Sequence, residues 1–133
     1  MVYGLRFSLI LMALGVIIGA FGAHAIQEHS SPESYQSFQT GVLYHFLHGL
    51  GMISISLIMQ AEWMEPSKGK WVIRLMTLGI FLFSGSIYLL ATREMTGFEW
   101  ARLIGPLTPL GGLCFLAAWI LAAISVRFPV LRD

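Results

Sequence analysis

The sequence is poor in charged residues and has almost no cysteine. Asp, Glu, Lys and Arg make up 11% of its 133 residues, whereas roughly a quarter of the residues in an ordinary soluble domain carry charge. Eight basic and seven acidic side chains leave a net charge of +1, so nothing indicates a basic surface and no nucleic-acid partner is expected. The single cysteine, Cys114, excludes an intramolecular disulfide and a cysteine-based metal motif.

Long apolar runs dominate the sequence, in which 56% of the residues are hydrophobic. A helix that crosses a bilayer needs about 20 mostly apolar residues, and four stretches meet this demand: residues 7–26, 41–60, 71–91 and 103–126. They lack the alternation of polar and apolar residues that is typical of membrane β-barrels. The sequence therefore predicts an all-α, polytopic membrane protein whose single domain, residues 1–133, crosses the lipid bilayer with four transmembrane helices.

The distribution of basic residues predicts the orientation, because Lys and Arg accumulate in cytoplasmic loops. Six lie near the chain ends or around the second loop, namely Arg6, Lys68, Lys70, Arg74, Arg127 and Arg132, while Arg93 and Arg102 lie on the other side. Both termini are therefore expected in the cytoplasm. An alternative stays open, since Arg6, an apolar run and Ala23-His24-Ala25 also imitate a cleaved signal peptide, whose removal would leave three spans.

Small residues in the first span predict a close helix contact. Gly15 and Gly19 form a G-x-x-x-G pattern, and Gly22 lies beside the same face. Residues 11–16 also resemble residues 75–80, which is compatible with two tandem helical hairpins. In the first outer loop, Ser31 as an N-cap before Pro32 predicts a short interfacial helix over residues 32–39.

Polar side chains in the spans gather in the outer half of the predicted bundle. Such groups are costly in lipid and usually face the interior, where they form hydrogen bonds. The expected cluster comprises His24, Tyr44, His45, His48, Ser84, Ser86, Tyr88 and Thr108. Pro106 and Pro109 flank it and free backbone carbonyls for bonding. The simplest interpretation is a hydrogen-bonded cluster that holds the outer ends of the helices together.

Other interpretations of this cluster remain open. His24, His45 and His48 can supply the three protein ligands of a catalytic zinc site, and imidazoles on facing helices can ligate a haem. The break at Pro106 is also compatible with passage of an ion or small molecule. Hydrolysis would need an orienting partner and an oxyanion hole that the sequence does not indicate. We expect no enzymatic activity and no cofactor.

Four segments carry a resemblance to a known family: GAFGAHA (19–25), TGVLYHFLH (40–48), FSGSIYLL (83–90) and GPLTPLGG (105–112). Together they resemble the domain of unknown function 423 family, which includes the eukaryotic transmembrane protein 256. The resemblance extends from the first helix to Trp119 and implies a four-helix protein of the bacterial inner membrane, or of an organellar membrane in a eukaryote, with no established activity.

Residue by residue, the resemblance points to positions that match the family motifs: His24, Tyr44, His48, Ser84, Ser86, Tyr88, Pro106, Thr108 and Pro109. His45 is not among them, which favours a hydrogen-bonded cluster over a three-histidine metal site. The expected function is structural or accessory, as a homo-oligomer or within a larger membrane complex. The alternative is a protein that binds or transports a small molecule or ion.

Overall fold

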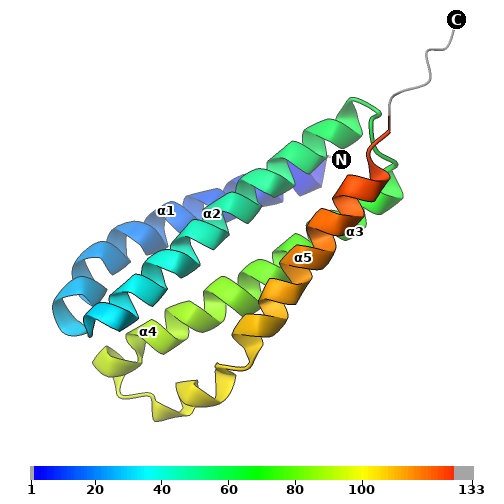
Figure 1. Ribbon diagram of the computed structural model, residues 1–133. Helices are drawn as coiled ribbons and strands as arrows, with labels where there is room; N and C mark the ends of the chain where they lie inside the picture. Colours follow the sequence, from blue (N-terminus) through cyan, green and yellow to red (C-terminus); the bar gives the residue numbers. More distant parts are fainter. Residues whose placement is uncertain (1, 128–133) are drawn as a thin grey trace, which may run out of the picture.

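A computed structural model describes residues 2–127 of the chain, and it contains four helices that are long and apolar enough to cross a membrane. The first two are the unbroken helices α1 (Val2–His29) and α2 (Pro32–Gln60). The other two are composite: α3 (Pro66–Gly79), the π-helix η1 (Ile80–Gly85) and α4 (Ser86–Thr96) form the third, and the 3₁₀-helix η2 (Glu99–Ile104) leads into α5 (Leu107–Ser125). The prediction of an all-α protein with four spans is confirmed (Figure 1).

The start of the second span differs from the expectation of a separate interfacial helix. Residues 32–39 form the first turns of α2, which continues without a break to Gln60. The capping signal is present as predicted, because the Ser31 hydroxyl accepts a hydrogen bond from the Ser34 backbone N–H at 3.3 Å and Pro32 opens the helix. The helix therefore projects beyond the apolar run that follows it.

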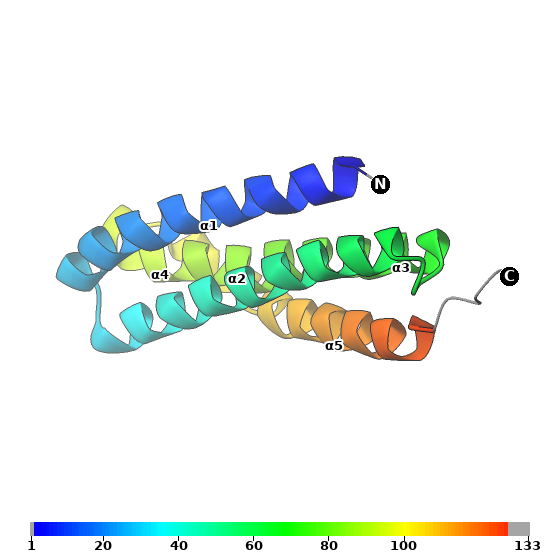
Figure 2. The same ribbon diagram turned by 90° about the horizontal axis from the view of Figure 1, so that it is seen from above.

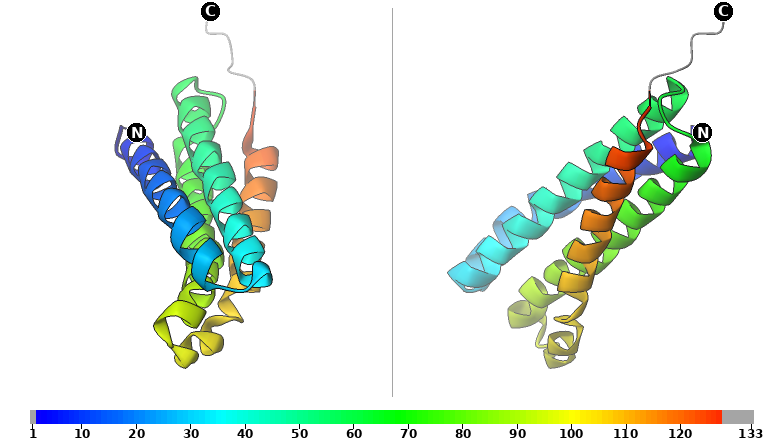
Figure 3. Two further views of the ribbon diagram at one scale, coloured as in Figure 1. Left: turned by 90° about the vertical axis from the view of Figure 1, so that its left-hand side faces the viewer. Right: turned by 45° about the vertical axis from the view of Figure 1, so that its right-hand side comes forward.

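The spans do not form a square bundle. α2 and the third span make a central pair, and α1 and α5 lie on opposite sides of this pair (Figures 2 and 3). α1 packs mainly on α2, whereas α5 packs on α3 and η1. α1 begins and α5 ends at the same end of the bundle (Figure 1). The connections at residues 30–31 and 97–106, the second of which contains η2, lie at the opposite end, here called the outer end.

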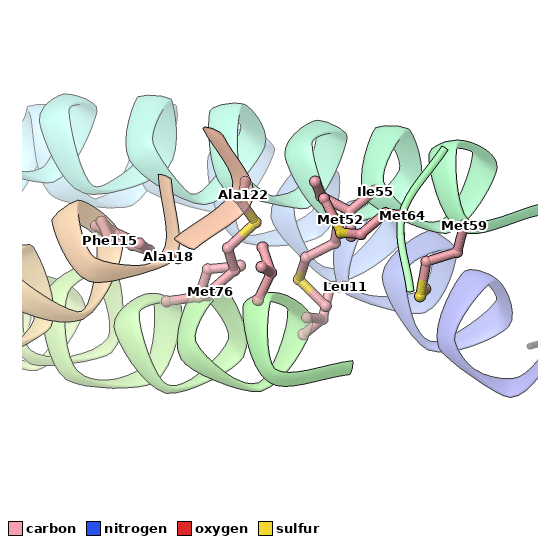
Figure 4. Packing of buried hydrophobic residues seen from close by; sticks show 11 residues of the cluster. Leu11, Met52, Ile55, Met59, Met64, Met76, Phe115, Ala118 and Ala122 are labelled. Carbon is pink, nitrogen blue, oxygen red and sulfur yellow. The ribbon is translucent and has the colours of Figure 1, made fainter. Parts of the chain in front are cut away.

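The larger apolar core cluster extends from the middle of the bundle toward the end opposite the outer end, here called the inner end, and is rich in methionine (Figure 4). Met52 and Met76 are fully buried between the central helices, and Met64 closes the core from the loop after α2. Flexible thioether side chains can fill irregular gaps between helices. Because lipid offers no hydrophobic drive for helix association, this close packing is a main source of cohesion in the bundle.

Two glycines show how closely the outer helices α1 and α5 approach the central pair. A Cβ atom added at Gly22 of α1 would lie 2.0 Å from Cζ of Phe38, whose ring packs over this position. A Cβ atom added at Gly111 of α5 would lie 2.4 Å from the backbone nitrogen of Phe83 in η1. The contact between Gly111 and Phe83 tolerates a larger side chain less well, because the opposing atoms belong to the backbone and cannot rotate away.

Backbone hydrogen bonds join two chain segments at the inner end of the bundle. The Arg127 N–H donates to the Trp63 carbonyl at 2.8 Å, and Met64 and Val126 form an isolated antiparallel bridge. The α2–α3 loop and the end of α5 are therefore joined directly.

Candidate functional site

His45 of α2 bridges the central pair and α1. Its Nε2 lies 2.9 Å from the carbonyl oxygen of Leu11, and because a carbonyl only accepts, Nε2 carries the hydrogen and donates. In the neutral ring Nδ1 then accepts from the hydroxyl of Tyr88 on α4, at 3.1 Å. One buried imidazole thus connects three helices, α1, α2 and α4.

Gly15 makes this arrangement possible. It lies one turn after Leu11 on α1, on the side of the helix from which the imidazole reaches the carbonyl. A Cβ atom at Gly15 would lie 3.5 Å from Nε2 of His45 and 3.3 Å from Cζ of Phe46, so a longer side chain would displace both rings. The G-x-x-x-G segment therefore provides access to a backbone acceptor as well as a helix contact.

A second bond joins α2 to the third span. Ser84 in η1 is fully buried, and its hydroxyl donates to the Gly41 carbonyl at 2.7 Å. Gly41 lies four residues before His45, and Ser84 four residues before Tyr88. The two interhelical bonds therefore join successive turns of the same two helices, α2 and the third span.

Ser86 and Thr108 connect the third span to α5. The Ser86 hydroxyl donates to the Phe83 carbonyl at 2.9 Å, which uses its only hydrogen. The Thr108 hydroxyl, 2.6 Å away, must then be the donor in the bond between the two side chains. Pro106 directly precedes α5 and Pro109 lies in its first turn, both exposed, so Thr108 is placed where this helix begins.

His48 points toward α5 instead. Its Nδ1 donates to the Tyr44 carbonyl one turn earlier, at 2.7 Å. The imidazole stacks on the Phe115 ring with 3.4 Å between centroids and 11° between planes. Tyr44 stacks in turn on Phe83, at 4.6 Å between centroids. His45 and His48 thus contact different helices, and the prediction that their rings share one ligand gains no support from this geometry.

His24 lies apart from His45 and His48, on the exposed face of α1. Gly15 is the α1 residue beside His45, and His24 follows nine residues later, which corresponds to about 13 Å along the helix. Within residues 2–127, no group of three His, Cys, Asp or Glu side chains is placed to hold a metal ion. The candidate ligands His24, His45 and His48 are therefore not brought together, and His24 does not join the predicted polar cluster.

A polar cleft at the outer end was not foreseen from the sequence. It has a volume of about 530 Å³ and lies between the first turns of α2 and the end of α4. Glu94 of α4 closes one side, because its carboxylate accepts from the Ser31 N–H at 2.7 Å and from the hydroxyls of Ser31 and Ser34 at 3.2 and 2.8 Å. A carboxylate at a helix N-terminus also interacts favourably with the helix dipole.

Together, four apolar spans and an interior closed by hydrogen bonds between helices define a polytopic α-helical membrane protein. The chain belongs to the family described as protein of unknown function (DUF423), whose model matches residues 18–112. The predicted family is therefore confirmed. Its matched region contains the central hydrogen bonds of α2 and the third span, although Leu11 and Gly15 precede it.

Relatives from several organisms support this assignment. The chain is 36% identical over 118 residues to the UPF0382 membrane protein YwdK of Bacillus subtilis, with 86% of each chain covered. It is 34% identical over 127 residues to the UPF0382 inner membrane protein YgdD of Escherichia coli, covering 90% of this chain and 88% of that one. A UPF0382 membrane protein of Schizosaccharomyces pombe is 37% identical over 109 residues, covering 80% and 86%. No solved structure matches the chain.

Proposed function

We propose that the chain is a structural or accessory protein of the bacterial inner membrane, without enzymatic activity, that works as a homo-oligomer or within a larger membrane complex. The inner membrane is inferred from the similarity to the inner membrane protein YgdD of E. coli. An organellar membrane is the corresponding location for a eukaryotic member.

The observation that supports this proposal is the use of the intramembrane polar groups. His45 bonds to Leu11 and Tyr88, Ser84 bonds to Gly41, and Ser86 bonds to Thr108. Each of these bonds joins two helices, as is usual for polar side chains that stabilise a bundle in lipid. Catalysis would instead need polar atoms directed at a substrate, and passage of an ion would need polar atoms along a water-filled path.

Exposed apolar surface supports association with other proteins as well as with lipid. In the most apolar 18-residue stretch of the first span, and in that of the last, only 22% of the stretch is buried within the bundle. Their outward faces carry large side chains, among them Leu9, Ile17, Phe21, Leu113, Leu116 and Ile124. These faces are available for lipid, a second copy of the chain or another membrane protein.

The experiment measures assembly and flux on the same preparation. The full-length chain, tagged and expressed at its native level, is extracted into lipid nanodiscs, and its mass is determined by light scattering. We expect a mass above that of one chain. In parallel, vesicles containing the protein are compared with empty vesicles across a panel of ions and small solutes, with no difference expected. A monomer that raises the flux, and loses that flux in His45→Phe, would reverse the proposal.

Ligand binding is the second candidate function, because the outer cleft offers space and polar side chains that the bundle interior does not. Its volume of about 530 Å³ lies within the usual range of ligand pockets, roughly 300–1,000 Å³.

A further inference from the structure

The outer cleft combines charges of both signs with an apolar wall. Glu33 and Glu94 line it from α2 and α4, and Arg93 adds a cation from α4. Ile87 and Leu90, also in the lining, lie deeper in the membrane, because α4 runs from the middle of the bundle to its outer end. A ligand that fits this cleft has an ammonium group, an anionic group and an apolar part that extends toward the bilayer.

We propose that the cleft binds phosphatidylethanolamine in the leaflet at the outer end of the bundle. The ammonium group of the lipid lies against Glu33 and Glu94, and its phosphate faces Arg93 and the hydroxyl of Ser37. The glycerol and acyl chains leave along Ile87 and Leu90. This site extends the second candidate function and is independent of whether the chain is an accessory protein.

Arg93 supplies the first argument. Its side chain is partly buried. Within residues 2–127 it forms no close ion pair, although it interacts electrostatically with Glu94, whereas Arg102 pairs with Glu99 at 3.1 Å. A guanidinium group matches the geometry of a phosphate and can bond to two of its oxygens at once. Ser37 lines the same cleft and can add a hydroxyl donor, whereas the Ser34 hydroxyl already donates its hydrogen to Glu94. The phosphate of a lipid therefore finds suitable donors on two helices.

The carboxylates of Glu33 and Glu94 favour an ammonium group at the other end of the headgroup. Glu94 accepts three hydrogen bonds from Ser31 and Ser34, and a carboxylate has about four acceptor sites, so one site remains. Glu33 forms no ion pair within the described part of the chain. A primary ammonium group donates three N–H bonds, whereas a choline group donates none. Because two carboxylates line the cleft, a lipid whose headgroup carries only negative charge is disfavoured.

The depth of the cleft favours a lipid over a soluble zwitterion. Its charged residues lie at the end of the spans, where headgroups meet water, and its apolar residues lie further into the bilayer. Thr108, at the start of α5, lines the same space. The cleft thus follows the order of groups in a phospholipid, from the charged headgroup to the apolar chains.

The test is native mass spectrometry of the full-length protein in detergent, with phosphatidylethanolamine, phosphatidylcholine or phosphatidylglycerol added at equal concentration. Wild type is expected to retain phosphatidylethanolamine at least about tenfold more strongly than the other two lipids. Arg93→Gln should lower that binding by about tenfold. Arg102→Gln is the matched control, because it removes the same charge on the same side of the membrane but outside the cleft, and it should bind like wild type.

A second pair of variants tests the ammonium end. Glu33→Gln should reduce the preference for phosphatidylethanolamine over phosphatidylcholine, and Glu28→Gln, on α1 outside the cleft, should leave it unchanged. Melting temperatures confirm that the variants are folded. Equal retention of the three lipids, or equal effects of Arg93→Gln and Arg102→Gln, would overturn the proposal. So would tight binding of soluble phosphoethanolamine by protein that does not retain the lipid.

Discussion

His45 and Leu11 are joined by a side-chain bond to the backbone of a neighbouring span, with 2.9 Å between Nε2 and the carbonyl oxygen. Backbone carbonyls inside a helix are normally shielded by the side chains of the following turn. Here the following turn presents Gly15, whose missing side chain admits the imidazole. The contact between α1 and the central pair therefore depends on a glycine and a histidine together.

Enlarging Gly15 is expected to separate α1 from α2. Gly15→Leu places a branched side chain where the rings of His45 and Phe46 lie, and overpacking of this kind typically costs about 1–3 kcal/mol. The measurement is reversible unfolding in mixed micelles, followed by circular dichroism. Ala13→Leu is the control, because Ala13 is exposed on the same helix. Equal stability of the two variants would contradict the close packing of α1.

The bond between His45 and Tyr88 can be measured by a double-mutant cycle. Tyr88→Phe removes the donor and leaves Nδ1 of His45 without its partner, at a cost of about 1–3 kcal/mol if no water replaces it. His45→Phe also removes the bond to Leu11. In the double variant the loss should be smaller than the sum of the two single losses, because both remove the same interaction. Strict additivity of the unfolding free energies would show that the two side chains do not interact.

Gly111 and Gly112 offer a matched pair at the contact between α5 and η1. Gly111→Ala puts a Cβ atom 2.4 Å from the Phe83 backbone nitrogen, so α5 must move outward, with an expected loss of about 1–3 kcal/mol. Gly112→Ala is the control, because the nearest atom to its Cβ would be 3.9 Å away. The readout is the unfolding free energy. A loss confined to Gly112→Ala would be incompatible with the packing described.

Glu94 is expected to hold the first turn of α2 to the end of α4. In Glu94→Gln the side chain keeps its size and one acceptor oxygen. It loses the charge that interacts with the helix N-terminus and one of the two oxygens to which Ser31 and Ser34 donate. Amide hydrogen exchange should accelerate over residues 31–38 and stay unchanged in the inner half of α2. Glu99→Gln, on η2, is the control. If exchange in the first turn of α2 is the same in both variants, Glu94 does not anchor that helix.

The number of spans follows from the length and composition of the apolar runs, which is why it could be predicted from the sequence. The glycines of α1 could also be identified as contact positions, because their spacing places them on one face. Partners within the polar cluster could not be assigned. They depend on how each helix is rotated about its axis, and the apolar pattern of a membrane helix defines that rotation poorly, since lipid-facing and buried positions are both hydrophobic.

His45 shows why hydrogen-bond partners could not be assigned from the sequence. The family resemblance pointed to His24 and His48 and left His45 aside, yet His45 is the histidine that bonds to two other helices. His24 is exposed. Glu94 illustrates another reason, because its partner Ser31 lies 63 residues away and on a different span. Ser31 was recognisable as a cap, but nothing in its local sequence indicates which carboxylate it meets.

The π-helix in the third span also affects how chains of this family compare with one another. A hydrogen-bonded ring of the π type encloses one residue more than a ring of the α type. A chain with one residue fewer between Gly79 and Ser86 can therefore replace η1 by an ordinary α-helical turn and still direct the same sides of α3 and α4 toward α2. A single-residue gap in the middle of a membrane span, normally a sign of misalignment, is physically reasonable at this position.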